Sequence, residues 1–121
     1  LAREFRDIAA RVDIPERQRF LNLYEAAHSL ALAGMLLGGY RPKEGDGNRY
    51  LPLSLAEDTL ALRKGSAAAF TESNRLRARQ KYHGVDTDFP ESTMEALEAG
   101  VEEALEEVRV RLKALRARKK S

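Results

Sequence analysis

The residue types best suited to chemistry gather in one short stretch, Asn74 to His83. It holds four cations and no acid, together with a tyrosine and one of the two histidines of the chain. An arginine can bind a scissile phosphate and stabilise the charge that develops in the transition state. A histidine can transfer the proton of a ribose 2′-hydroxyl at neutral pH. Arg77 and His83 together therefore predict metal-free cleavage of RNA as one chemistry for this stretch.

Helical geometry restricts that chemistry. Arg77 and His83 are six residues apart, which on a regular helix is about 120° around the axis and about 9 Å along it. Arg79 and His83 are the better neighbours on one face. For Arg77 and His83 to reach one phosphate, the helix must end or bend between them, or the two residues must come from different protomers. The alternative is a solvated helix end, whose cations complement the helix dipole and pair with glutamates of the last helix.

Other kinds of site find little support in the sequence. His28 lies within the most apolar helix, where a histidine is more often a hydrogen-bonded core residue than a ligand. We expect no metal, since no pair of histidines has metal-binding spacing and the seven glutamates between residues 91 and 107 mostly share a solvated face. Gly-x-x-x-x-Gly-Lys and Gly-x-Ser-x-Gly motifs are absent, so no cofactor is expected. The lack of cysteine excludes disulfides, thiolate nucleophiles and cysteine zinc sites.

Length and charge indicate one soluble domain. The 121 residues suffice for a single core over 1–121. The net charge of +2 is too small to indicate nucleic-acid binding by itself, but the charges are unevenly placed. Residues 91–107 contain seven glutamates and no cation, whereas residues 109–121 contain seven cations. The longest apolar run, Leu30 to Leu37, is too short to span a membrane, so we expect a cytoplasmic protein without a membrane partner.

Two long helices have the clearest patterns. The last helix runs from about Pro90 to about Arg118, with capping-box spacing at its start and a basic tail at 118–121. Its apolar residues recur at helical steps: Met94, Leu97, Val101, Leu105, Val108, Leu112 and Leu115. At about 1.5 Å per residue it is roughly 40 Å long, so its C-terminal turns should project or pair. The other starts near Asp13 and stops at Gly38-Gly39. It is apolar nearly all round, which predicts a central helix or a dimer seam.

The remaining segments complete an all-α prediction. We expect, in chain order, an N-terminal helix over 1–13, a surface loop from Tyr40 to Arg49, a short helix that starts near Ser54 and ends by Gly65, a helix from Ala67 to Tyr82, and a loop from His83 to Phe89. The predicted fold is an up-down bundle of four to five helices.

Several residues resemble the HEPN superfamily, a group of four-helix-bundle domains found beside minimal nucleotidyltransferases and in toxin-antitoxin and CRISPR-associated ribonucleases. The matching residues are Arg19-Phe20, Tyr24-Glu25-Ala26-Ala27, Gly39-Tyr40-Arg41-Pro42, and Arg77 with Tyr82. Active HEPN ribonucleases have an arginine followed, after four to six residues, by histidine, and five residues separate Arg77 from His83. In the small bacterial subgroup that the chain resembles, the histidine position often holds tyrosine, here Tyr82.

The resemblance implies two function classes. In the enzyme, Arg77 positions phosphate, His83 is the general acid or base, and Arg79, Lys81 and Tyr82 hold RNA. In the non-catalytic class, the same stretch with Asn74 and Arg75 binds RNA, a nucleotide, or a partner nucleotidyltransferase or antitoxin. HEPN domains generally form homodimers, which would join two copies of the stretch into one composite cleft. A third hypothesis is a purely structural dimerisation module, in which the acidic and basic halves of the last helix pair in antiparallel fashion.

Overall fold

The computed structural model describes residues 16–40, 50–83 and 90–120, of which residues 50, 80–83 and 120 contribute backbone only. This part of the chain forms four helices and no strand: α2 (Glu16–Leu37), α3 (Tyr50–Thr59), α4 (Lys64–His83) and α5 (Glu91–Lys120). The all-α prediction is therefore confirmed. The predicted N-terminal helix over 1–13 lies outside the described residues, as do residues 41–49 and 84–89 of the two predicted loops.

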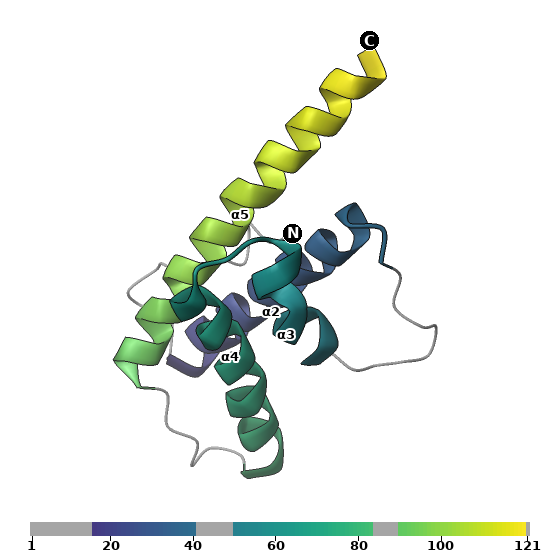
Figure 1. Cartoon of the computed structure of the whole chain (residues 1–121). Helices are drawn as coiled ribbons and strands as arrows, with labels where there is room; N and C mark the ends of the chain where they lie inside the picture. Colours follow the sequence, from purple (N-terminus) through teal and green to yellow (C-terminus); the bar gives the residue numbers. More distant parts are fainter. Residues whose placement is uncertain (1–15, 41–49, 84–89, 121) are drawn as a thin grey trace.

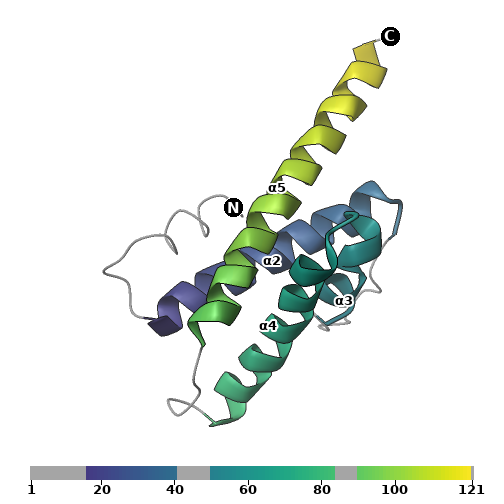
Figure 2. The same cartoon turned by 60° about the vertical axis from the view of Figure 1, so that its left-hand side comes forward.

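Helix α2 lies at the centre of the bundle, as its nearly continuous apolar surface predicts. It packs against α3, α4 and α5, and α4 also packs against α3 and α5 (Figures 1 and 2). The largest fully buried side chains come from all four helices: Phe20, Leu23, Leu53, Leu60, Phe70, Met94, Leu97 and Val101. One shared core therefore holds the four helices together.

The end of α2 follows the prediction closely. Gly39 has a positive φ of 86°, a backbone conformation that glycine adopts without steric cost. The Tyr40 amide donates to the Met35 carbonyl at 2.9 Å, and the Gly39 amide donates to Leu36 at 3.1 Å. These two bonds form a Schellman motif, which satisfies the last carbonyls of the helix.

The short helix differs from its prediction. It begins at Tyr50 rather than at about Ser54, and it ends at Thr59, before the predicted limit at Gly65. Ser54 lies inside α3, where its hydroxyl donates to the Leu51 carbonyl at 3.0 Å. Serine can bond to the preceding turn of its own helix in this way, so capping-box spacing did not mark a helix start here. Gly65 belongs to the first turn of α4. Ser92 is likewise the second residue of α5 rather than its cap.

Helix α5 packs on the bundle over its first two-thirds and then projects from it (Figures 1 and 2). Val108 is buried, whereas Leu112 and Leu115 on the same face are each 40% exposed. Between them, the Arg111 guanidinium donates to the Thr59 carbonyl and binds Glu107, with 2.8 Å between Arg111 Nε and Glu107 Oε1. Arg111 thus joins α5 to the end of α3 at the point where α5 leaves the bundle.

Two glycines allow helices to approach closely. A Cβ atom added at Gly34 of α2 would lie 2.7 Å from Cγ of Leu60. One added at Gly100 of α5 would lie 3.0 Å from Cε1 of Phe70 in α4. Both distances are shorter than carbon atoms in van der Waals contact allow. Because Gly34 has no side chain, α2 can lie close to Leu60, just after α3. Because Gly100 has none, α5 can lie close to α4.

By length and composition alone, α2 is also apolar enough to cross a membrane. The buried core helix of a soluble protein passes the same test, and 56% of the apolar window of α2 is buried in the bundle. This is weak evidence for a span. The cytoplasmic location stays a prediction.

Candidate functional site

The predicted site begins on a firmly held part of α4. Asn74 is half-buried, and its Oδ1 accepts a hydrogen bond from the Tyr24 hydroxyl at 3.2 Å. Tyr24 in turn stacks on Phe20, one turn earlier in α2, with 6.0 Å between the ring centroids. Asn74 therefore helps to fix α4 to α2, and its predicted contact with RNA stays a prediction.

The first cation of the stretch has an acidic partner just outside it. Arg75 binds Glu72 through two hydrogen bonds, with 2.9 Å between Arg75 Nε and Glu72 Oε2. The hydrogen bond from Arg75 lowers the pKa of Glu72, desolvation opposes that shift, and the charges of Arg75 and Arg79 add to it. The positive charge of Arg75 is therefore largely compensated. Of the remaining described cations, Arg79 is exposed and Arg77 is half-buried.

The path of α4 decides how Arg77 and His83 are related within one chain. The helix is continuous from Lys64 to His83, so it neither ends nor breaks between the two residues. They are therefore about 120° apart around the axis. Of the conditions stated above for Arg77 and His83 to reach one phosphate, an end of the helix between them is therefore not met, and a bend or a pairing of two protomers remains. The side chains of Lys81, Tyr82 and His83 lie outside the described residues, so their predicted roles stay predictions.

The pair of Glu72 and Arg75 makes stability depend on pH. Because the pKa of Glu72 is lowered in the folded state, its carboxylate stabilises the fold above its ordinary pKa. This contribution is lost as the pH falls through the lowered value. We expect Glu72→Gln to be slightly less stable than the parent at neutral pH, since the pair is mostly exposed.

Urea unfolding of the parent and of Glu72→Gln across the acid range would measure this dependence. The difference in free energy of unfolding should shrink to zero as the pH falls. The substitution Glu57→Gln, at an exposed residue of α3, controls for loss of a negative charge. A difference for Glu72→Gln that persists at the acid end would contradict the assignment.

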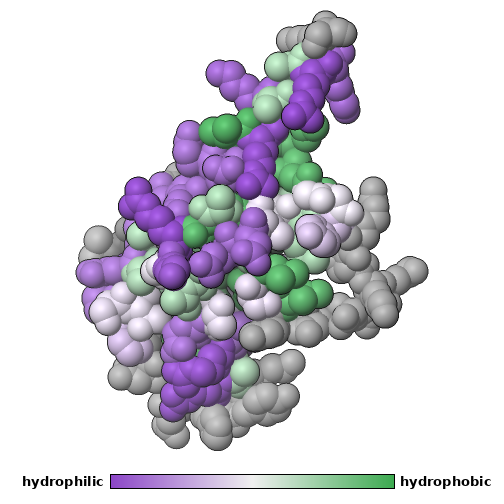
Figure 3. Space-filling view, viewed as in Figure 1, coloured by the Kyte–Doolittle hydropathy of each residue, from purple (hydrophilic) through white to green (hydrophobic). Residues whose placement is uncertain are grey.

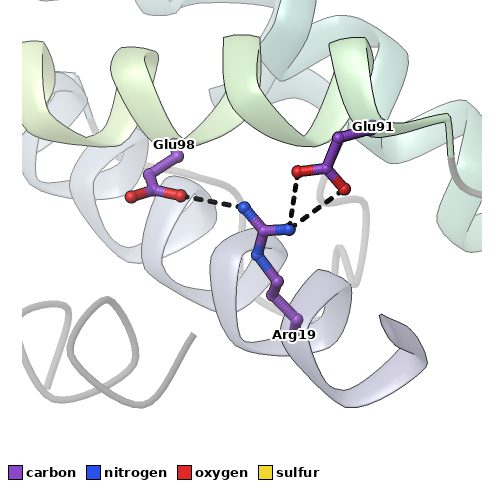
Figure 4. Close-up of polar contacts among 3 residues, drawn as sticks. All are labelled: Arg19, Glu91 and Glu98. Atoms are coloured by element: carbon purple, nitrogen blue, oxygen red, sulfur yellow. Dashed lines mark hydrogen bonds and ion pairs between the residues drawn. The ribbon is translucent and has the colours of Figure 1, made fainter. Parts of the chain in front are cut away.

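A second polar cluster joins α2 to α5 (Figure 4). The guanidinium of Arg19 donates to both carboxylate oxygens of Glu91, at 2.9 and 3.2 Å, and to Oε2 of Glu98 at 3.1 Å. Hydrogen bonding to Glu91 is the main cause that raises the pKa of Arg19. In the sequence, Arg19 stands out only as part of the HEPN resemblance. The one signal in the sequence for this cluster is the run of glutamates over residues 91–107, which contains no cation. Such a run attracts a cation from another part of the chain.

Metal binding finds no support in the described part of the chain. Glu25 and His28 have the Glu-x-x-His spacing that metal centres in helical bundles use. The expectation of no metal, stated above, overlooked this spacing. Within the described residues, however, no group of three or more such side chains could hold a metal ion. Glu25 and His28 each already take part in an interaction. We therefore assign them no ligand.

Comparison of the chain with protein-family models, curated proteins and solved structures gives no match. The HEPN resemblance therefore stays an expectation that rests on its short motifs. What can be stated is the all-helical architecture and the placement of the predicted residues within it. Asn74, Arg75, Arg77 and Arg79 all lie in the C-terminal half of α4.

Proposed function

We propose that this chain is an RNA-binding helical module whose contact surface is the C-terminal half of α4, from Asn74 to His83. The observation that carries the proposal is the continuity of α4, which presents four cations on a helix segment without an acidic residue. Phosphate contacts supply most of the affinity in binding that does not depend on base sequence. Such a segment suits them, because each arginine offers a forked donor that matches a phosphate.

The individual residues divide into support and contact. Asn74 anchors the helix to Tyr24 of α2, so the basic segment is held on a rigid element. Arg75 is partly neutralised by Glu72. Arg77, which is half-buried, and Arg79, which is exposed, are the next two described cations of the segment and the proposed phosphate contacts. Lys81 extends the segment by one more cation. The HEPN resemblance agrees with this role, since non-catalytic members of that superfamily bind RNA.

The proposal is one of binding rather than cleavage. On a regular helix, Arg77 and His83 lie about 120° apart around the axis, whereas metal-free cleavage needs both residues at one phosphate. Cleavage would therefore require a bend of the helix or a meeting of the two residues across a dimer. RNA binding needs no such meeting, because each phosphate contact acts independently.

Fluorescence anisotropy with a labelled single-stranded RNA of about 20 nucleotides tests the proposal. The double variant Arg77→Ala/Arg79→Ala should lower the affinity by about tenfold or more and reduce the salt slope by about two. Arg63→Ala is the matched control, because Arg63 is exposed and immediately precedes the other end of α4. It should bind RNA almost as tightly as the parent.

Three results would contradict RNA binding at α4: no binding by the parent, an affinity independent of salt, or equal losses in Arg63→Ala and the double variant. A mononucleotide that binds as tightly as the RNA would show recognition of a single phosphate group, with no role for the strand. Circular dichroism of each variant confirms that loss of affinity does not reflect unfolding.

A further inference from the structure

One edge of α5 carries charges in a regular order. Stepping by three or four residues, the edge presents Glu91, Glu95, Glu98 and Glu102, and then Arg109, Lys113, Arg116 and Lys120. On a straight helix these positions fall within about 60° around the axis. The edge is therefore acidic along the half of α5 that packs on the bundle and basic along the half that extends beyond it.

The two halves mirror each other about the point between Leu105 and Glu106. Glu102 lies as far before this point as Arg109 lies after it, and the same holds for Glu98 with Lys113 and for Glu95 with Arg116. Glu91 and Lys120 extend the relation to the ends of the helix. If two copies of α5 lay antiparallel about this point, every acidic residue of one would be level with a basic residue of the other.

The acidic half borders a shallow groove with an excess of negative charge. Arg19 of α2 and five residues of α5 line it: Glu91, Glu95, Glu98, Ala99 and Glu102. The Arg19 guanidinium binds Glu91 and Glu98 (Figure 4), so most of the charged groups that line the groove are carboxylates. Glu95 and Glu102 are exposed. Because like charges close together destabilise a surface, the groove suits a strongly basic partner.

The basic half supplies such a partner and has apolar surface to bury. Its described cations from residue 112 onward are exposed, as is Arg109. Leu112 is 40% exposed, and Leu105, which lies seven residues earlier on the same face, is only partly buried. Figure 3 shows hydrophobic and hydrophilic residues intermixed along this projecting part of the molecule. Association along the edge would cover Leu112 as well as bring opposite charges together.

We infer that two copies of this chain associate through α5 in an antiparallel, two-fold symmetric pair centred near Leu105. The basic half of each α5 lies along the acidic groove of the other copy. The contact is isologous, because each copy provides both halves of it. This inference does not rest on the proposed RNA binding.

The arrangement also bears on the composite cleft expected from the HEPN resemblance. In Figures 1 and 2 the C-terminal end of α4 and the projecting end of α5 lie at opposite ends of the molecule. An antiparallel pair through α5 therefore places the two α4 surfaces at opposite ends of the dimer. Each copy then binds RNA separately, and Arg77 of one copy does not meet His83 of the other.

A charge-swap experiment tests the inference by sedimentation of the full chain. The parent should be a dimer at micromolar concentration in low salt. The variants Glu95→Arg/Glu102→Arg and Arg109→Glu/Arg116→Glu each turn attraction into repulsion at both altered positions, and the two-fold symmetry repeats the effect. Each should raise the dissociation constant of the dimer by at least about tenfold. An equimolar mixture of the two should dimerise again, because all the altered residues then face opposite charges.

The mixture distinguishes this contact from a general effect of changing the charge of α5. A mixture that stays monomeric while both variants keep their helical circular dichroism would overturn the inference, as would a monomeric parent. If either double variant loses its fold, the chain carrying all four substitutions serves instead, since its self-pairing restores every opposite charge. Failure of that chain to dimerise overturns the inference equally.

RNA is the competing occupant of the basic half of α5. A monomeric parent whose RNA affinity falls in Arg109→Glu/Arg116→Glu would assign the basic half to nucleic acid and overturn self-association. Conversely, a dimeric parent with loss of RNA affinity only in Arg77→Ala/Arg79→Ala supports both proposals. Dimerisation without any RNA binding supports the α5 contact and contradicts the α4 function, so the two can fail independently.

Discussion

Replacement of Phe70 by alanine is expected to lower the free energy of unfolding by about 3–5 kcal/mol. Phe70 of α4 is fully buried. Its ring packs against Gly100 of α5, at a point where a side chain on α5 would be too close to the ring. Removing the ring loses its transfer free energy and leaves a cavity that the neighbouring helices can fill only by moving. Such a loss is a large part of the roughly 5–15 kcal/mol that is typical of a domain.

Urea unfolding followed by circular dichroism would measure the loss for Phe70→Ala. Leu115→Ala is the control, because Leu115 lies on the projecting part of α5 and is 40% exposed. At a concentration where the protein is monomeric, this control should change the free energy of unfolding by no more than about 0.5 kcal/mol. Equal losses in the two variants would mean that Phe70 is not a central core residue.

Gly34→Val should also lower the free energy of unfolding, for the opposite physical reason. Its Cβ would lie 2.7 Å from Cγ and 2.8 Å from Cδ2 of Leu60, and Leu60 is itself only 1% exposed. Because Leu60 has little room to move, α2 and the segment after α3 must separate. Overpacking of this kind costs about 1–3 kcal/mol and occasionally more.

The matched control for Gly34→Val is Gly65→Val. Gly65 also lies in a helix, but a Cβ added there meets no atom within 4 Å. That substitution should therefore change the free energy of unfolding by less than about 0.5 kcal/mol. A tolerated Gly34→Val, with a midpoint of unfolding equal to that of Gly65→Val, would contradict the close approach of α2 to Leu60.

The long helices could be predicted from the sequence because their signals are local. Apolar residues at helical steps placed α5 within two residues at its C-terminal end, and the Gly38-Gly39 pair marked the end of α2. The predicted start of α3 was wrong because residues with capping-box spacing, here Ser54 and Glu57, occur inside helices as well as at helix starts. Packing of Leu53 and Leu60 in the core holds α3 in place, and no local signal contains that information.

The candidate site was harder to predict, since charges find partners across the chain. Arg19 and Glu98 are 79 residues apart in sequence, and only the packing of α2 on α5 brings them together. The pair of Arg75 and Glu72 is different, because its spacing of three residues is visible in the sequence. The predicted basic stretch contains Arg75 but not Glu72, because it begins at Asn74, two residues after Glu72.

The projecting part of α5 has a practical consequence for measuring the protein in solution. Beyond Arg111, the described helix projects as far as Lys120 (Figures 1 and 2), and at about 1.5 Å per residue this adds roughly 13 Å to one end. Such a shape increases friction with the solvent, so a single copy will migrate through a gel-filtration column ahead of a sphere of equal mass. An elution volume alone would therefore overstate the molecular mass, and light scattering or sedimentation equilibrium is needed to count the copies.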